Sequence, residues 1–447
     1  MRNADQNRSS LGSLHRRSFL RAASALSVPY FVPQSVFANA PSDRLTHACF
    51  GADGMGWSDL QSLASHPRIE IVAICDVDTD RMGKASEKLP QARRYQDWRE
   101  LLASEGDKID SVNVSVPDHS HAPITLAALE RKKHVYCQKP LTHNVAEARA
   151  VAQAAATQGV TTQMGNQIQS HGYYRTATEI VRSGLIGKVQ AIHAWTGAKY
   201  TQQPRPAGAD PVPMSLNWDL WLGVAPKRPF KTGLYHPFNW RCWQDFGGGA
   251  LGDFGCHILD TPFKAVGLTT PLTIRAEVPE TWHSDQSRRE EVWPDWEIVH
   301  YEFPGTELTA GKTIPVTWYD SGKQPDRELF GFASADDKVP GSGALFIGED
   351  GKLLLPHVGA PSLLPGSKSL AAPLPQVEGF NHYHAYIDAC LGQGSTGSSF
   401  DFAGPLAEAT LLGTIAVRCP NVTLEWNPQK LQFTNSAEAN QFVGTAK

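Results

Sequence analysis

The sequence predicts an α/β protein with two folded domains, and three observations support this prediction. At 447 residues, the chain is long enough for two or three domains. Residues 44–165 alternate apolar, strand-like runs with helix-like stretches, which is typical of a parallel sheet. Residues 166–443 contain several short strand-like runs separated by long polar or Pro-rich segments. We therefore expect an N-terminal parallel α/β domain, followed by an α+β domain with an open, mostly antiparallel sheet.

The first forty residues have the pattern of an export signal. The pair Arg16-Arg17 precedes a short apolar run over residues 22–32 and a small-residue site at residues 38–40. This order is typical of a twin-arginine signal peptide. We expect residues 1–40 to be such a peptide, read by the twin-arginine export machinery, and the mature protein to be periplasmic. The apolar run is too short to span a bilayer, so we expect no stable membrane insertion.

Composition excludes some functions. The formal net charge is −4, so the chain has no excess of basic residues that would indicate nucleic acid as a partner. The seven cysteines are dispersed and contain no CxxC pair. We interpret them as buried small hydrophobes and not as a disulfide framework.

The first apolar run, residues 46–50, leads into the turn Gly51-Ala52-Asp53-Gly54-Met55-Gly56 and a helix-like stretch over 57–65. A second strand, 69–75, ends on Asp76, about 20 residues beyond the last glycine of the turn. This is the order of a Rossmann dinucleotide-binding unit, in which the helix start faces the pyrophosphate and the acid accepts from the ribose hydroxyls. Because the charge of Asp76 repels a 2′-phosphate, the pattern favours NAD over NADP.

Asp53 departs from this pattern. In G-x-G-x-x-G the middle glycine lets the backbone approach the phosphates, and here an anionic side chain occupies that position. We therefore expect Asp53 to weaken or reorient the bound dinucleotide.

The remaining elements of the first domain follow the same alternation. We expect helices at 97–103, 123–130 and 145–158, and strands at 111–116, 134–137 and 160–164. Thr142 or Asn144 is suited to cap the helix that starts at residue 145.

Lys139 follows the strand 134–137, which must stop at Pro140 because proline has no amide hydrogen to donate. The carboxyl edge of a parallel sheet is where ligands bind, so an ammonium held there can polarise a substrate hydroxyl or carbonyl. An ordinary solvated lysine is the alternative.

A second domain starts near residue 166. We expect helices at 173–183, 381–391 and 406–418, and strands at 189–195, 272–278, 297–303, 308–312, 344–348, 352–355 and 421–426. The segment 202–243 is rich in proline and holds Trp218, Trp221, Trp240 and Trp243, which we expect to fill a core or an interface more often than to stack on sugars.

Asp253 and His257 stand at positions i and i+4 if a helix starts near Ala250, so they share a helix face. A carboxylate beside an imidazole raises the basicity of the ring, as a general base requires. A helix ion pair and two ligands of a metal site are the alternatives. No other segment offers strong ligand spacing, and we interpret His382 and His384 as packing or hydrogen-bonding residues, so we expect no metal.

These motifs together resemble the Gfo/Idh/MocA family of oxidoreductases. The resemblance covers nearly all of residues 44–443 and rests on the glycine turn with Asp76, on residues 117–123, on Gln138-Lys139-Pro140 and on residues 252–257. It implies catalytic roles for Lys139, Asp253 and His257. It also implies cofactor contacts from the turn and from the loops after the next strands, namely Gly51, Asp53, Gly54, Met55, Gly56, Asp76, Val116, Pro117, His119, His121, Gln138 and Lys139. Gln138 replaces the usual Glu and removes a negative charge beside Lys139.

The resemblance implies hydride transfer between NAD and a carbinol carbon of a sugar or polyol. His257 would take the hydroxyl proton, Asp253 would orient His257, and Lys139 would stabilise the alkoxide. Because a periplasmic enzyme has no free NAD pool, we expect the cofactor to stay bound and to be regenerated in place, either by a second substrate or in a redox-neutral glycosidase cycle. A non-catalytic sugar- or nucleotide-binding protein is the third possibility. We also expect a homo-oligomer.

Overall fold

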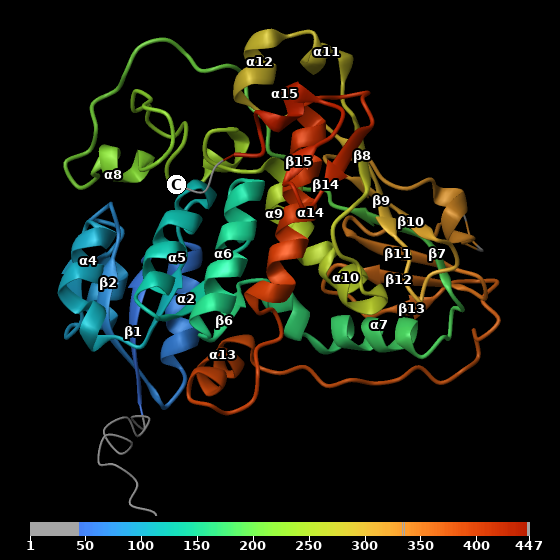
Figure 1. Cartoon of the computed structure of the whole chain (residues 1–447), viewed down its shortest axis with the longest axis horizontal. Helices are drawn as coiled ribbons and strands as arrows, with labels where there is room; N and C mark the ends of the chain where they lie inside the picture. The colour runs from blue at the N-terminus through green and yellow to red at the C-terminus, as the bar shows by residue number, and fades with distance from the viewer. Residues whose placement is uncertain (1–43, 333, 335, 445–447) are drawn as a thin grey trace, which may run out of the picture. The chain divides into compact units, whose positions relative to one another are not determined.

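The computed structural model describes residues 44–332, 334 and 336–444, so the predicted signal peptide lies outside the described residues. Two sheets dominate this part of the chain (Figure 1), one with six strands and one with nine. Helices pack between and around them, and α14, drawn in red, runs alongside α6. The predicted combination of a parallel α/β domain with a second, mostly antiparallel α+β domain is confirmed.

The first sheet has the strand order β3-β2-β1-β4-β5-β6, and every neighbouring pair is parallel. This is the doubly wound order of a dinucleotide-binding domain. Its strands are β1 (Leu45–Phe50), β2 (Ile69–Cys75), β3 (Arg93–Tyr95), β4 (Ser111–Val114), β5 (His134–Cys137) and β6 (Thr162–Met164). β4 and β5 are buried along almost their whole length, as expected for strands covered on both faces.

The helices of this domain agree closely with the sequence prediction. They are α2 (Met55–Ala64), α3 (Gly83–Lys88), α4 (Trp98–Glu105), α5 (His121–Glu130) and α6 (Val145–Gln158). Asn144 and not Thr142 caps α6: its side chain accepts from the Glu147 amide, and the Glu147 side chain accepts from the Asn144 amide. The short elements α3 and β3 lack a clear apolar period and were not predicted.

The second sheet has the order β13-β12-β11-β7-β10-β9-β8-β14-β15. Only the β7–β10 pair is parallel, and the other pairs are antiparallel. Its strands are β7 (Val189–Trp195), β8 (Thr273–Glu277), β9 (Ile298–Pro304), β10 (Thr313–Tyr319), β11 (Gly343–Gly348), β12 (Lys352–Pro356), β13 (Ser362–Leu363), β14 (Leu424–Asn427) and β15 (Gln432–Phe433). The accompanying helices are α7 (Gly172–Arg182), α8 (Trp218–Leu222), α9 (Gly249–Ile258), α10 (Asp260–Val266), α11 (Glu280–His283), α12 (Gln286–Glu291), α13 (His382–Cys390), α14 (Phe400–Arg418) and α15 (Ala437–Asn440).

The strand predicted at residues 308–312 is wrong, and the strand β10 directly after it was missed. Thr306 and Thr309 form a tight turn there, in which the Thr306 amide donates to the Thr309 hydroxyl over 2.7 Å. Pro315 disfavours a central strand because it cannot donate to a neighbour. It is tolerated because pairing of β10 with β7 starts only at Val316, so Pro315 lies where β10 pairs with β9 alone.

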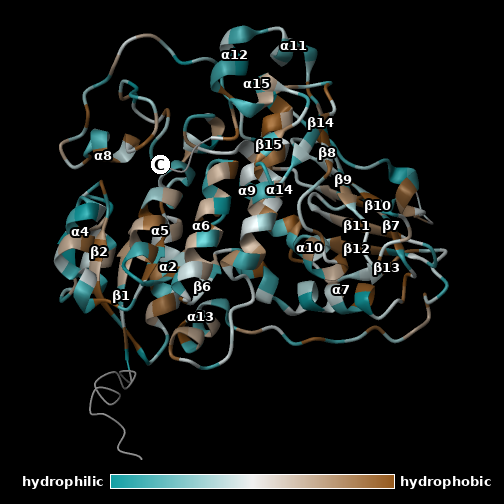
Figure 2. Cartoon of the chain, viewed as in Figure 1, coloured by the Kyte–Doolittle hydropathy of each residue, from teal (hydrophilic) through white to brown (hydrophobic). Residues whose placement is uncertain are grey.

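α14 begins six residues earlier than predicted and contains Pro405. Among the described residues it is the one helix long and apolar enough to cross a membrane, but 83% of that stretch is buried inside the protein. Figure 2 shows apolar colour along α14 and on strands of the second sheet. Packing between the two sheets therefore accounts for its hydrophobic character and outweighs the hydrogen bond that Pro405 loses.

The tryptophans of segment 202–243 fill a small core of their own, as predicted. Trp221, Trp240 and Trp243 are buried, and Trp218 stacks on Trp221 at a centroid distance of 4.6 Å. All seven cysteines are free; six are buried and Cys390 is partly buried, which confirms their interpretation as small hydrophobes.

A buried carboxyl pair makes stability depend on pH. The Glu297 amide donates to the Asp320 carboxylate over 3.2 Å, and the Trp318 indole donates to it over 3.0 Å. Burial, reinforced by the negative charge of Asp320, raises the pKa of Glu297 well above its ordinary value, and burial also raises the pKa of Asp320 to about 6.

Groups with raised pKa values contribute stability that is complete below the unfolded pKa of about 4 and is lost as pH rises through the folded pKa. We therefore expect the wild-type protein to lose unfolding free energy as pH rises above about 4, through the Asp320 pKa of about 6 and beyond it. The Glu297→Gln variant, whose side chain cannot ionise, should lose less, as urea denaturation at several pH values would show. Parallel pH profiles for the two proteins would contradict the assignment.

Candidate active site

A cavity of about 450 Å³ lies at the carboxyl edge of the first sheet. It receives residues that follow four parallel strands: Gly51 after β1, Asp76 after β2, Ser115 after β4, and Gln138 and Lys139 after β5. The predicted site residues that line it are Gly51, Asp53, Gly54, Met55, Asp76, Val116, Pro117, Gln138, Lys139 and Asp253. Tertiary folding thus brings the glycine turn, the acid and the lysine to one site, as the strand order requires.

The glycine turn is shaped for close backbone approach. A Cβ on Gly51, whose φ is +91°, would lie 2.1 Å from the Ser115 carbonyl oxygen, and a Cβ on Gly56 would lie 2.6 Å from the Gly51 backbone. Gly56 does not line the cavity, and its lack of a side chain lets the start of α2 approach the Gly51 backbone closely. α2 starts with no side-chain cap, so its first amides are available to an anion.

Asp76 is fixed by two backbone amides. One carboxylate oxygen accepts from the Ala52 amide over 2.9 Å, and the other accepts from the Asp78 amide over 3.0 Å. Burial raises the pKa of Asp76 to about 6, while these amides oppose the shift. Each oxygen keeps a lone pair for a ribose hydroxyl, so the glycine turn, the α2 start and Asp76 together fit a dinucleotide.

Asp53 forms an ion pair with Arg81, and Lys84 lies 4.0 Å from its other oxygen. The negative charge that was expected to oppose the pyrophosphate is therefore balanced inside the cavity, which Arg81 also lines. Sequence reasoning missed this partner because Arg81 lies in an irregular stretch after β2.

Releasing Arg81 should change the cofactor preference. In an Asp53→Gly variant the guanidinium loses its closest carboxylate, keeps only Asp78 at 3.9 Å, and can pair with a 2′-phosphate. We expect the ratio of NADP to NAD affinity to rise about tenfold, measured by titration calorimetry of cofactor-stripped protein. The double variant Asp53→Gly/Arg81→Gln should lose this gain. An unchanged ratio in the single variant would contradict a role for Arg81.

Lys139 and Asp253 form the centre of a polar network. The ammonium of Lys139 donates to the Asp253 carboxylate over 2.6 Å and to the Asp253 carbonyl over 2.9 Å. Arg241 Nε donates to the same carboxylate oxygen over 3.1 Å, and the Tyr200 hydroxyl donates to the other over 2.9 Å. The exposed fractions of the Lys139 and Asp253 side chains are only 13% and 11%. Lys139 is therefore a held ammonium and not a solvated lysine.

The expected Asp253–His257 hydrogen bond is absent from the structure. Although burial alone raises the pKa of Asp253, Lys139 and Arg241 outweigh it and hold this pKa well below its ordinary value. Both carboxylate oxygens are occupied by Lys139, Arg241 and Tyr200, so Asp253 orients the lysine and not the imidazole. Helix spacing predicted the shared face of α9 but could not predict partners contributed from other elements.

His257 lies one turn beyond Asp253, outside the residues that line the cavity. Its Nδ1 is buried and has no hydrogen-bond partner among the described residues. Burial first, and then the charge of Lys139, holds the pKa of His257 well below its ordinary value. The ring is therefore neutral and is a weaker base than a free imidazole, which is the opposite of the shift expected from Asp253.

Gln138 is oriented by a carboxylate that the sequence did not reveal. Its side-chain nitrogen donates to both oxygens of Asp59 on α2, over 3.0 and 2.9 Å. The Ser115 and Tyr383 hydroxyls also donate to Asp59. Burial raises the pKa of Asp59 to about 6. Asp59 thus supplies the acidic group that Gln138 lacks. It contacts Gln138 and does not line the cavity itself.

His119 and His121 do not line the cavity, contrary to expectation. His119 bonds to the carbonyls of Trp221 and Phe246, and His121 bonds to the carbonyls of Pro140 and Val116. Their rings hold neighbouring loops in place.

Three further cavity residues were not given roles by the sequence. They are Tyr200, Arg241 and Asp118, the last of which has its pKa raised to about 7 by burial. Tyr200 comes from an irregular segment and Arg241 from a short 3-10 helix, Asn239–Cys242. Neither has a periodic sequence signal, so only their tertiary position marks them. Within the described part of the chain, no group of three His, Cys, Asp or Glu residues could hold a metal ion. His382 and His384 bond to Ser170, Met164 and Ser65, in line with their predicted structural roles.

The fold and this cavity define a two-domain protein of the dinucleotide-binding class. Residues 45–166 match the NAD-binding Rossmann fold of the Gfo/Idh/MocA oxidoreductase family, and residues 175–298 match the C-terminal alpha/beta domain of that family. The chain therefore belongs to the Gfo/Idh/MocA family.

Individual relatives resemble parts of the chain. An inositol 2-dehydrogenase from Rubrobacter xylanophilus is 31% identical over 162 residues, which are 34% of this chain and 44% of that enzyme. An inositol dehydrogenase homologue from Azotobacter vinelandii, solved with NADH and myo-inositol, aligns with 86% of this chain and 98% of its own at 18% identity and a TM-score of 0.56. An aldose-aldose oxidoreductase from Caulobacter crescentus, solved with glycerol, aligns with 86% of this chain and all of its own at 18% identity and a TM-score of 0.55.

Proposed function

We propose that this protein is an NAD-dependent oxidoreductase that transfers a hydride between a tightly bound nicotinamide cofactor and a hydroxyl-bearing carbon of a sugar, polyol or glycoside. One observation carries the proposal: the buried ammonium of Lys139, fixed by Asp253, shares a single cavity with the glycine turn and Asp76. The names of the inositol and aldose enzymes above support a polyhydroxylated substrate.

Each residue has a chemical role in this proposal. The bound nicotinamide supplies the hydride chemistry. Lys139 donates a hydrogen bond to the reacting oxygen and stabilises the negative charge that develops on it. The neutral imidazole of His257 accepts the hydroxyl proton, and the Asp253 carboxylate positions Lys139. Arg241 and Tyr200 hold Asp253 in turn.

Asp76 favours NAD over NADP in this proposal, since its fixed carboxylate accepts from ribose hydroxyls and repels a 2′-phosphate. Mass spectrometry of the small molecules released on denaturation, without added cofactor, tests cofactor retention. We expect about one NAD per chain. If none is released and none binds on addition, the non-catalytic binding protein becomes the better reading.

A second measurement separates the remaining possibilities. The protein holding bound NAD is mixed with neutral sugars, polyols and glycosides, and the reduced cofactor is followed by its absorbance. Lasting reduction indicates a dehydrogenase that needs a second substrate, whereas glycoside cleavage without net reduction indicates the redox-neutral cycle. In either case His257→Ala should abolish turnover, and undiminished turnover would remove His257 from the mechanism.

We also propose export to the periplasm by the twin-arginine machinery, supported by Arg16-Arg17 and the apolar run after them. Changing both arginines to lysine should retain the protein in the cytoplasm on cell fractionation.

We further propose a homo-oligomer, supported by the large open second sheet. Light scattering that gives the mass of a single chain would contradict it.

A further inference from the structure

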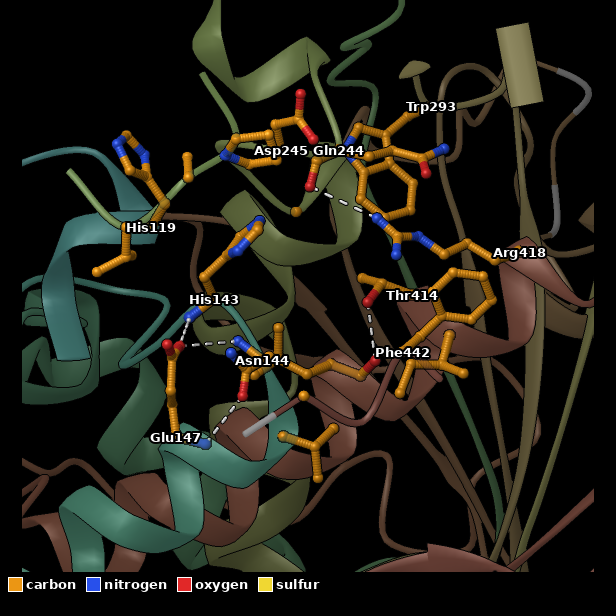
Figure 3. Close-up of a pocket in the computed structure, with 18 residues that line it drawn as sticks. His119, His143, Asn144, Glu147, Gln244, Asp245, Trp293, Thr414, Arg418 and Phe442 are labelled. Atoms are coloured by element: carbon orange, nitrogen blue, oxygen red, sulfur yellow. Dashed lines mark hydrogen bonds between the residues drawn. The ribbon is translucent and has the colours of Figure 1, made fainter. Parts of the chain in front are cut away.

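A second cavity, of about 320 Å³, lies where the start of α6, the segment before α9 and the end of α14 meet. We call it the Arg418 cavity. Figure 3 shows Arg418 beside Gln244 and Trp293 on one side, and Asn144 and Glu147 on the other. Its volume lies within the range of small-molecule sites. Catalysis as proposed above uses none of these side chains.

Among the residues that the structure describes, the guanidinium of Arg418 has no carboxylate bound to it, unlike a typical buried arginine. No ion pair joins it to any described residue, and its Nε is buried without a hydrogen-bond partner among them. Its Nη2 makes one long hydrogen bond, of 3.5 Å, to the Gln244 carbonyl. The rings of Phe442 and Trp293 lie 4.6 and 5.4 Å from its central carbon. They shield the cation but cannot replace a counter-ion.

Other charges around the cavity are already engaged. The Asp245 carboxylate accepts from Arg205 over 2.7 Å and from Arg228 over 2.9 Å, so it serves two other guanidinium groups. Glu147 is occupied by the capping box at the start of α6. Burial lowers the pKa of His143 to about 3, so its ring is neutral. Burial also lowers the pKa of Arg418 to about 10, with Asp245 opposing the shift, and the guanidinium remains charged at neutral pH.

The cavity also offers a neutral donor. The side-chain oxygen of Asn144 accepts from the Glu147 amide over 3.0 Å, which leaves the side-chain nitrogen with no partner in the described part of the chain. An unpaired guanidinium with aromatic rings beside it and an amide donor opposite matches a planar or tetrahedral oxyanion.

We propose that the Arg418 cavity binds a small anion carrying a carboxylate or phosphate group, with Arg418 as its principal contact. The bound group supplies the counter-charge that the described residues do not. The Arg418 cavity is separate from the dinucleotide cavity, but a hydrogen bond joins their linings. The amide of Gly248 in the Arg418 cavity donates to the carboxylate of Asp118 in the dinucleotide cavity. The segment that leads into α9 therefore connects the two cavities.

The test measures anion binding with the dinucleotide site already filled, because that site also attracts phosphate. Inorganic phosphate and malonate are titrated separately into NAD-saturated protein at constant ionic strength, and the melting temperature is recorded. We expect a saturable rise with at least one of the two, which also tells a phosphate ligand from a carboxylate ligand. In Arg418→Gln the dissociation constant should rise at least about tenfold, and Arg418→Lys should fall between the two. No saturable rise with either anion would overturn the proposal.

The matched control is Lys227→Gln, which removes one exposed positive charge that pairs with Asp219. It should bind like wild type, and an equal loss would mean that general charge and not the cavity is responsible. If Arg418→Gln does not fold, a crystal of the wild-type protein soaked in selenate decides instead. An anomalous peak beside Arg418 supports the site, and its absence there at full occupancy of other sites refutes it. These readouts need no turnover, so they stand apart from a failure of the proposed oxidoreductase activity.

Discussion

Replacing Lys139 with Met should lower kcat/KM by about 10²–10³-fold while leaving NAD bound. The Lys139 ammonium donates directly to Asp253 and follows β5, at the strand end where the reacting oxygen is proposed to lie. Methionine keeps the length of the side chain and removes the donor. The loss should fall mainly on kcat, because the interaction strengthens as charge develops on the oxygen. Cofactor reduction with the best substrate of the panel gives the measurement.

The control for this variant is Lys199→Met. Lys199 is adjacent to Tyr200 in the sequence, but its side chain is 52% exposed and pairs with Asp295 outside the cavity. Its activity should remain within about threefold of wild type, as for a surface pair of small energetic worth. A Lys139→Met enzyme with less than a tenfold loss would show that the lysine does not stabilise the reacting oxygen.

Asp253→Asn should reduce the free energy of unfolding by about 3–5 kcal/mol and remove most activity. The substitution leaves Lys139 and Arg241 buried next to each other without the carboxylate that now lies between them. Because the pKa of Asp253 is lowered in the folded state, its contribution to stability is present above the unfolded pKa of about 3.9 and is lost as pH falls. Wild type and variant should therefore converge in strongly acidic solution. Guanidinium denaturation at several pH values measures both effects.

Two comparisons separate the ion pair from a general defect. Asp219→Asn removes one partner of an exposed pair and should cost under about 1 kcal/mol. The double variant Lys139→Met/Asp253→Asn should be more stable than Asp253→Asn alone, since it removes one of the two facing cations. A double variant that is less stable than Asp253→Asn alone would argue against charge imbalance as the cause.

The first domain was predictable from the sequence because each of its parallel strands is buried and bounded by turn residues. β2, β5 and α6 were predicted at their observed bounds. Errors are concentrated in the second domain, where β10 tolerates Pro315 through its pairing register and α14 continues through Pro405. Register and burial depend on neighbours that are distant in the sequence, so local propensity could not reveal them.

The candidate site also has a part that local sequence predicts and a part that distant neighbours decide. The glycine turn, Asp76, Lys139 and the α9 face that carries Asp253 could be found because strand ends and helix spacing place them. The sequence alone also marked this chain as a member of an NAD-binding family, and it supplied the residue types that the chemistry of that family requires. Only the tertiary structure decided that Asp253 binds Lys139 instead of His257, that Arg81 balances Asp53, and that Asp59 holds Gln138. Each of these contacts joins separate elements, and hydrogen bonds and ion pairs act only at short range, so the folded arrangement alone determines which partners meet.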